Sequence, residues 1–276
     1  MRRLLPAMLL SALLASAANL EVVRSAISDS EGGPPNPPGA SYHPGDSLYF
    51  TGRISGYTKD DKEQVRLAYT VQAFDPHGVA LNEPYKNNVN AEVAPQDKEW
   101  LPKIETAISL PPLLFAGEYK IVVKAQDLIA KTSAELEVPV RVRGREDIHP
   151  ADSLSVQAFR FLRHEDDTRP AERPAYVPGD HLWAKFDITG FRYGPGNRID
   201  VSYVTSVLGP DGNTLWTQRE PVGEQSESFY PRAFVPAEMS IELQPKIKPG
   251  AYTLVVQAKD AIGNQTSELR EPFTIE

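Results

Sequence analysis

The chain has 276 residues, of which 41% are hydrophobic and 24% are charged, and its formal net charge is −8. This length suits two ordinary domains, and the composition is that of a folded globular protein rather than of a disordered or membrane-embedded one. The acidic balance offers no broad basic surface to phosphates, so nucleic acid is not expected as a partner.

The first 18 residues are predicted to be a secretory signal peptide. Arg2 and Arg3 precede an apolar stretch from Leu4 to Ala15, and small residues follow at the expected cleavage site. The stretch is shorter than the ~20 residues of a membrane-spanning helix, so we expect cleavage and no membrane span afterwards. The chain has no cysteine, which excludes disulfides and the modified cysteine of a lipoprotein. The expected location is periplasmic or extracellular.

The remainder of the chain contains two copies of one unit, about 134 residues apart. The segment Tyr42 to Asp46 (YHPGD) corresponds to Tyr176 to Asp180 (YVPGD), and Gly117 to Asp127 corresponds to Gly250 to Asp260. Comparison of the copies predicts the following organisation: a first domain at 19–143, a linker at 144–152 and a second domain at 153–276.

Within each copy, apolar and polar residues alternate with a period of two, which predicts half-buried strands. Pro and Gly signals such as Asp75 to Gly78 and Gly209 to Gly212 separate them, and about seven strands are expected per copy. The predicted inward rows of the two copies are Leu48, Phe50, Ile54, Val65, Leu67, Tyr69, Val71, Tyr119, Ile121 and Val123, and Leu182, Phe186, Ile188, Ile199, Val201, Tyr203, Val207, Tyr252, Leu254 and Val256.

The segment Pro249 to Asn264, with Phe115 to Asp127 as its first-copy partner, resembles the last hairpin of bacterial immunoglobulin-like repeats of exported proteins. The YHPGD-type motif is also similar to the macroglobulin-type variant of this sandwich. The resemblance implies an all-β chain with two tandem immunoglobulin-like β-sandwich domains. It further implies that the Tyr119 and Tyr252 hydroxyls fold back onto nearby backbone. It implies no particular activity, because fold does not determine function.

Gly45 to Leu48 (GDSL) matches the nucleophile block of a lipase and esterase family, which would make Ser47 the nucleophile. The second copy has His181 at that position, and no later histidine completes the triad. We therefore interpret the block as a turn that leads into a strand and expect no catalytic residue and no enzyme activity. A hydrolase remains only a remote alternative.

No cofactor and no metal are expected. The five histidines lack the spacing of zinc ligands: His43, His77, His149, His164 and His181. Asp127 and Asp260 follow equivalent strands, and Glu165 to Asp167 form an acidic loop. We interpret the two aspartates as turn residues that bond their own backbone, with calcium ligation as the alternative.

Aromatic residues are the candidates for partner contact. Tyr49 and Trp183 occupy corresponding positions between inward residues, so their rings are predicted on an outer sheet face. Trp216 has no aromatic counterpart in the first copy. Trp100 corresponds to Phe234, and both are predicted to fill a core socket. Burial of the candidate rings under a loop or the neighbouring domain is the alternative to contact with a partner.

Two loop regions could also bind: Glu31 to Ala40, paralleled by Arg163 to Ala175, and Asn82 to Lys103, paralleled by Arg219 to Glu238. The alternative is that the prolines only stiffen the first of these loops, without any ligand. We expect an exported, non-catalytic binding or spacer protein that contacts a protein or glycan partner through loops and faces. The alternative is an accessory component of the cell envelope whose edge strands pair with another chain.

Overall fold

The computed structural model describes residues 19–97 and 99–276. The predicted signal peptide lies outside these residues. The described chain consists of strands and loops with one short 3-10 turn, η1 (Pro195–Asn197), so the all-β prediction is confirmed. Nowhere in the described ranges is a helix long and apolar enough to cross a membrane.

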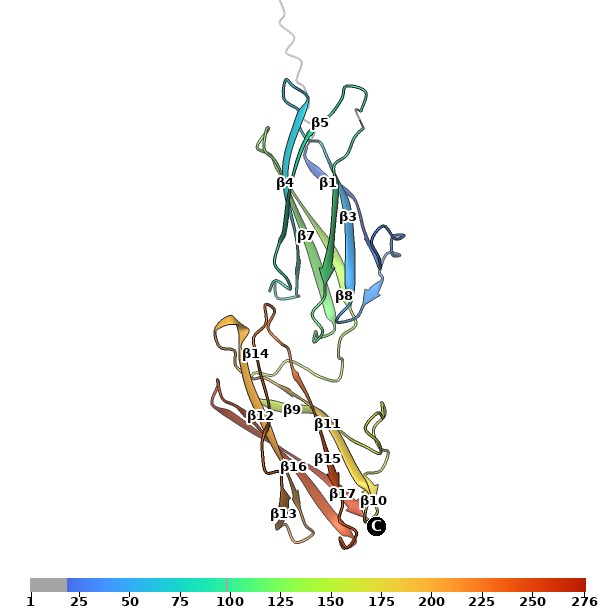
Figure 1. The fold of residues 1–276 in the computed structure, drawn as a ribbon, viewed down its shortest axis with the longest axis vertical. Helices are drawn as coiled ribbons and strands as arrows, with labels where there is room; N and C mark the ends of the chain where they lie inside the picture. The colour runs from blue at the N-terminus through green and yellow to red at the C-terminus, as the bar shows by residue number, and fades with distance from the viewer. Residues whose placement is uncertain (1–18, 98) are drawn as a thin grey trace, which may run out of the picture.

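The first half of the chain forms two sheets packed face to face, called here the first sandwich (Figure 1). One sheet has the strand order β1-β3-β6 and the other the order β2-β8-β7-β4-β5. The pairing is antiparallel except between β2 and β8. The strands are β1 (Glu21–Ser28), β2 (Ser41–Tyr42), β3 (Ser47–Ser55), β4 (Gln64–Phe74), β5 (Tyr85–Glu92), β6 (Lys103–Ser109), β7 (Gly117–Asp127) and β8 (Ser133–Val142).

The second half repeats this plan and is called the second sandwich. Its sheets have the orders β15-β11-β9 and β10-β17-β16-β12-β13, and β14 also pairs with β12. The strands are β9 (Ser155–Leu162), β10 (Ala175–Tyr176), β11 (His181–Thr189), β12 (Ile199–Leu208), β13 (Thr214–Thr217), β14 (Val222–Ser226), β15 (Val235–Glu242), β16 (Gly250–Asp260) and β17 (Gln265–Ile275).

Each sandwich has its own hydrophobic core, to which both of its sheets contribute. All residues of the predicted inward rows are buried, because successive side chains of a strand point to opposite faces. In the second core, the rings of Phe186 and Tyr203 meet edge to face with centroids 5.0 Å apart. Burial of each large apolar side chain stabilises the fold by about 1.5–3 kcal/mol.

The strand count exceeds the predicted seven per copy. A two-residue strand, β2 or β10, adds a parallel pair to each sandwich. The edge strand opposite β12 is split into β13 and β14. The segments Asn82 to Lys103 and Arg219 to Glu238, predicted as long loops, contain the edge strands β5 and β14. That prediction was wrong in this respect, since these residues pair with the central strands β4 and β12.

The tyrosine prediction is confirmed in both copies. The Tyr119 hydroxyl donates to the main-chain oxygen of Phe115 at 3.1 Å, and the Tyr252 hydroxyl donates to that of Lys248 at 2.6 Å. Burial, with a smaller contribution from the nearby Asp75 carboxylate, raises the pKa of Tyr119 to about 12. Both phenols therefore perform the same structural task at the entry to β7 and β16.

The prediction that Trp100 and Phe234 are both core residues was wrong for Trp100. Phe234 is only 2% exposed, whereas Trp100 is 36% exposed and packs edge-on against Tyr57. The reason lies at the junction of the sandwiches, where Phe115 and Arg145 cover the Phe234 ring with centroid distances of 5.9 and 5.8 Å. Trp100 lies at the opposite end of the first sandwich, and no neighbouring sandwich covers it.

The predicted linker, 144–152, packs against the molecule at this junction. Ile148 is buried, and Arg145 pairs with Asp187 of β11 through a contact of 2.8 Å. A second bond crosses the junction from the Tyr230 hydroxyl to Oδ2 of Asp75, at 3.1 Å. These contacts join the two sandwiches end to end (Figure 1).

Candidate functional site

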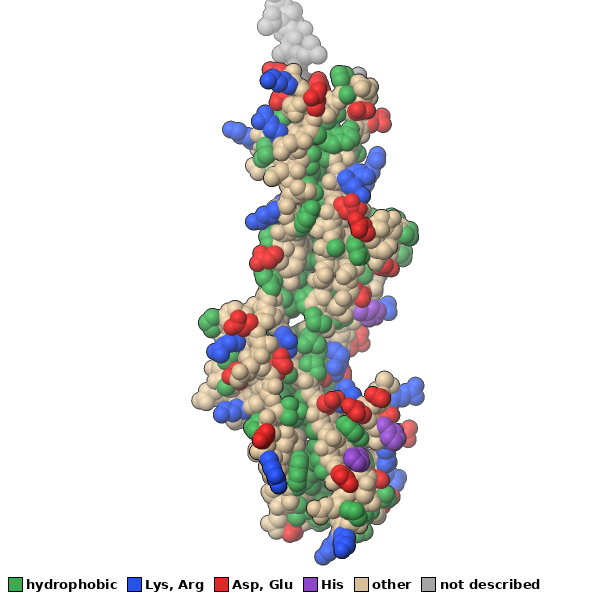
Figure 2. Space-filling view, in the orientation of Figure 1, with side chains coloured by type: hydrophobic (Ala, Val, Ile, Leu, Met, Phe, Trp, Pro, Cys, Tyr) green, Lys and Arg blue, Asp and Glu red, His purple; other side chains and the backbone are tan. Residues whose placement is uncertain are grey.

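An open pocket of about 710 Å³ lies on the second sandwich, where β9 ends and β11 begins. Figure 2 shows histidine side chains gathered with acidic and basic ones on this half of the molecule. The pocket is lined by Arg163, His164, Tyr176, Gly179, Asp180, His181 and Trp183. It thus combines one residue predicted for partner contact, Trp183, with a cation and two imidazoles that come from separate segments.

Arg163 is held above the buried Tyr176 ring, with its guanidinium carbon 5.3 Å from the ring centroid. Its Nη2 donates to the main-chain oxygen of Arg173 at 3.3 Å. The turn beneath it is shaped by Asp167, whose Oδ2 accepts the main-chain N–H groups of Arg163 and His164 at 3.1 and 2.8 Å. The sequence therefore fixes the direction of the arginine through a local turn and a cation–π contact.

Trp183 lies on the outer face of β11, between the buried Leu182 and Ala184, and its ring is half-buried. The next outward residue, Lys185, donates from Nζ to the main-chain oxygen of Glu165 at 2.7 Å and so holds the β9–β10 loop over this face. The predicted outer-face position of Trp183 is confirmed. Its contact with a partner stays a prediction.

The corresponding place in the first sandwich is built differently. There Asn36 donates from Nδ2 to Asp29 at 2.7 Å and to the Tyr42 hydroxyl at 3.2 Å. The main-chain N–H of Asn36 also bonds the oxygen of Ile27 at the end of β1. In the second sandwich Ala171 makes the equivalent bond to Phe161, but it has no amide side chain. The asparagine bridge of the first copy is therefore absent from the second, where the pocket lies.

Two other depressions recur in both copies and therefore belong to the fold. One, of about 690 Å³, lies on the face of β4, β7 and β8, and its counterpart of about 500 Å³ lies on β12, β16 and β17. They are lined by equivalent strand residues, among them Tyr69 and Tyr203. Because they recur, these depressions are weaker candidates for a function of this particular chain.

Tyr49 and Trp216 do not join the pocket. Tyr49 is half-buried on the outer face of β3, as predicted. Trp216 is 40% exposed on β13, a strand that the first sandwich replaces by a single bridge between Phe74 and Ala80. The two tryptophans singled out in the second copy thus occupy different sheets.

Ser47 is exposed at the start of β3, where it pairs with Ser109 of β6. His164 and His181, which are far apart in the sequence, share the pocket. Sequence spacing could not reveal this pair, because the β9–β10 loop folds back onto the start of β11. In the described ranges, no group of three or more His, Asp or Glu side chains is arranged to hold a metal.

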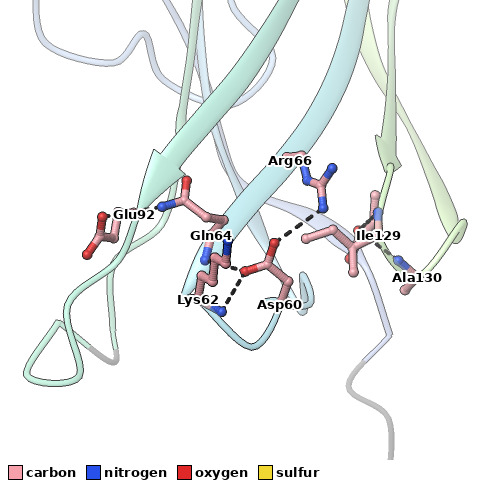
Figure 3. A network of polar contacts seen from close by, with 8 residues as sticks. Asp60, Lys62, Gln64, Arg66, Glu92, Ile129 and Ala130 are labelled. Atoms are coloured by element: carbon pink, nitrogen blue, oxygen red, sulfur yellow. Dashed lines mark hydrogen bonds and ion pairs between the residues drawn. The ribbon is translucent and has the colours of Figure 1, made fainter.

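Asp127 and Asp260 bond their own turns, as predicted. Oδ1 of Asp127 accepts the main-chain N–H groups of Ile129 and Ala130 at 2.8 and 3.1 Å. Its Oδ2 accepts the N–H of Thr58 at 2.7 Å, which ties the β3–β4 connection to the β7–β8 turn. Figure 3 shows this end of the first sandwich, with the Ile129 and Ala130 amides beside the Asp60 network.

The Asp60 carboxylate organises the neighbouring β3–β4 turn. Its Oδ1 accepts the N–H groups of Lys62 and Gln64 at 2.9 and 3.0 Å, and its Oδ2 pairs with Arg66 at 3.2 Å (Figure 3). The Gln64 bond, followed by the Lys62 bond, holds the pKa of Asp60 below its usual value. The acid serves the backbone of its own turn.

Calcium should therefore not change the stability of the chain. The oxygens of Asp127 and Asp260 face N–H donors, whose positive ends compete with a cation for the same lone pairs. We expect the same melting temperature with excess calcium and with excess chelator, measured by circular dichroism. If excess calcium raised the melting temperature by more than a few degrees, a cation would bind after all.

No family model and no curated protein sequence matches this chain.

Proposed function

We propose that this chain is an exported, non-catalytic binding protein of two immunoglobulin-like domains that takes a glycan in the pocket of the second sandwich. The observation that carries the proposal is the indole of Trp183 at an open pocket, whereas in the first sandwich Asn36 bridges Asp29 and Tyr42 at the corresponding place. A feature present in one copy alone cannot be explained by the needs of the shared fold.

The pocket chemistry supports binding of a sugar. Trp183 offers a flat apolar surface on which a sugar ring can lie with little loss of side-chain entropy. Around it, Arg163 donates hydrogen bonds, Asp180 accepts them, and His164 and His181 can do either, which suits hydroxyl groups. Pockets that combine an aromatic surface with a few polar groups are the usual form of a small-molecule site.

The proposal of a non-catalytic role rests on the same residues. The lining contains no serine, threonine or cysteine to serve as a nucleophile. Its one carboxylate, Asp180, already accepts the Val177 N–H at 2.8 Å and thereby shapes the turn before β11. Export is supported by the predicted signal peptide at 1–18, which would place the mature protein among envelope or extracellular glycans.

The test compares saccharide binding by the wild-type chain with binding by the variant Trp183→Ala. In isothermal titration against a panel of soluble oligosaccharides, we expect at least one to bind the purified mature chain, and Trp183→Ala to weaken that binding by about 10-fold or more. The matched control is Tyr49→Ala, the equivalent outer-face ring of the first sandwich, which should bind as wild type does. A panel that shows no binding, or equal loss in both variants, would count against the pocket.

A second candidate function is pairing through an edge strand, and β13 is the observation that favours it. Leu215 is 57% exposed beside Trp216, and this strand of four residues carries no charge or proline to prevent pairing with another chain. Association that Leu215→Lys abolishes, measured by analytical ultracentrifugation, would support it. A wild-type chain that stays monomeric and captures no extended peptide would dismiss it.

A further inference from the structure

We infer that the pocket of the second sandwich selects an acidic saccharide, with a sugar ring on Trp183 and a carboxylate on Arg163. The inference rests on the proposed function of this site and names its ligand class. It concerns sugars such as uronic acids, in which a carboxylate is attached to the ring that stacks.

The guanidinium of Arg163 is positioned to bind an anion. It makes no ion pair with any acid in the described residues, and the hydrogen bond from Nη2 to Arg173 uses only one of its five N–H donors. The contact with Tyr176 fixes its position, so little further side-chain entropy is lost when a carboxylate arrives. A guanidinium of this kind favours bidentate binding of a carboxylate.

Comparison of the two copies shows that the electrostatics changed together with the shape. Arg163 corresponds to Asp29 of the first copy, so the side chain at this position is positive in the second copy and negative in the first. The remaining differences among the lining residues replace small or hydroxyl side chains by larger ones with nitrogen donors. They are His164 for Ser30, His181 for Ser47 and Trp183 for Tyr49. All four changes favour an anionic, ring-containing ligand in a chain whose overall charge is −8.

Two acids near the pocket are held by the backbone of their own turns. Asp167 accepts the two main-chain N–H groups of its own turn, and Asp180 accepts that of Val177. Glu242 lies opposite His181 in the β11–β15 register, on the far side of the pocket from Arg163. A ligand carboxylate is therefore directed to Arg163, and its hydroxyls to Asp180 and the imidazoles.

The arrangement favours a sugar over an acidic peptide. An extended peptide binds by adding a strand to a free sheet edge, which requires a row of main-chain groups. The pocket instead offers side chains from the face of β11 and from two turns. Donors and acceptors alternate over a few residues around one indole, which matches the closely spaced hydroxyls of a sugar ring.

The experiment compares an oligogalacturonate with its methyl ester, a pair that has the same sugar rings but differs in the negative charge and the added methyl group of the carboxyl. By isothermal titration at low salt, we expect the mature chain to bind the acid form about 10-fold or more tightly than the ester. Arg163→Gln should remove this preference, because it should weaken binding of the acid form much more than binding of the ester. The control is Arg173→Gln, whose side chain is exposed near Glu276 and whose main-chain oxygen is unaffected.

The outcomes separate this inference from the proposal on which it rests. Equal binding of acid and ester, both lost in Trp183→Ala, would overturn the acidic preference and keep the glycan site. Binding of neither, with unchanged tryptophan fluorescence, would overturn both. Binding of poly-glutamate that depends on Arg163, without any binding of saccharide, would identify an acidic peptide and also overturn the inference. Circular dichroism of each variant checks that it is folded.

Discussion

Replacing Asp260 by alanine is expected to lower the free energy of unfolding by about 4 kcal/mol. The Asp260 side chain is fully buried, and its oxygens accept the main-chain N–H groups of Ile262 and Arg192 at 3.0 and 2.8 Å. Gln265 adds a side-chain bond at 3.3 Å. Alanine would leave these part-buried donors without their acceptor, and each unpaired buried donor costs roughly 1–3 kcal/mol. Urea unfolding followed by tryptophan fluorescence measures the loss.

The equivalent variant of the first sandwich, Asp127→Ala, should show a loss of similar size, since three N–H groups depend on that carboxylate as well. Asp211→Ala is the control. Asp211 also accepts a main-chain N–H, that of Asn213, but it lies exposed in a hairpin turn where water can replace it. If Asp260→Ala and Asp211→Ala shifted the urea midpoint equally, the buried carboxylate would not hold its end of the sandwich together.

Arg145→Ala is expected to cost about 3 kcal/mol at neutral pH, because it removes the countercharge of a buried acid. Asp187 is only 2% exposed, and Nη2 of Arg145 lies 2.8 Å from its Oδ2. The variant also uncovers one face of Phe234 at the junction. The control is Arg141→Ala, which breaks an exposed contact of 3.7 Å with Glu118 and should cost less than about 1 kcal/mol.

The cost of Arg145→Ala should depend on pH. Burial raises the pKa of Asp187, and Arg145 lowers it only in part. The folded state therefore retains the Asp187 proton to higher pH than the unfolded state does, so the contribution of Asp187 to stability falls as the pH rises through its folded pKa. Below that pKa the acid is neutral and needs no countercharge. Arg145 also holds the pKa of Asp147 below its usual value. In contrast to that of Asp187, the stabilising contribution of Asp147 is present at neutral pH and is lost as the pH falls through its folded pKa.

We therefore expect the difference between wild type and Arg145→Ala to shrink between pH 7 and about pH 4.5, measured by urea unfolding at each pH. The double variant Arg145→Ala, Asp187→Asn should recover much of the loss at pH 7, because its buried amide carries no charge. A penalty that is the same at both pH values, and unchanged in the double variant, would mean that Arg145 acts through packing alone.

The inward rows could be predicted from the sequence because they depend on local geometry, whereas the tyrosine bonds were implied by the resemblance to immunoglobulin-like repeats. Alternation along β3 and β4 decides which face each side chain occupies, whatever the sheet packs against. The turn role of Asp127 and Asp260 follows in the same way, since an aspartate bonds backbone two or three residues further on. Their third bonds, to Thr58 and Arg192, cross the sandwich and had no sequence signal.

The pocket could be predicted only in part. Trp183 was identified because its position alternates with buried neighbours and its counterpart is Tyr49. Arg163 and His164 belong to the candidate loop Arg163 to Ala175, but the sequence does not single them out within it; a residue-by-residue comparison with Asp29 and Ser30 reveals the change of charge. Their approach to the start of β11 depends on how the β9–β10 loop folds, and its pinning by Lys185 is visible only in three dimensions.

The sequence by itself determined that this chain contains two β-rich copies, which side chains form each core, and where the aromatic candidates lie on their strands. Repeats and periodicity carry this information because a strand alternates its faces residue by residue. Only the tertiary structure decided that Phe234 is buried while Trp100 is exposed, and that the segment 144–152 joins the sandwiches through Arg145 and Asp187. It also decided that Asn36 bridges Asp29 in one copy where the other copy has a pocket. These features depend on which distant segments come into contact. Whether a side chain at the junction is buried depends on both sandwiches and not on its own strand alone.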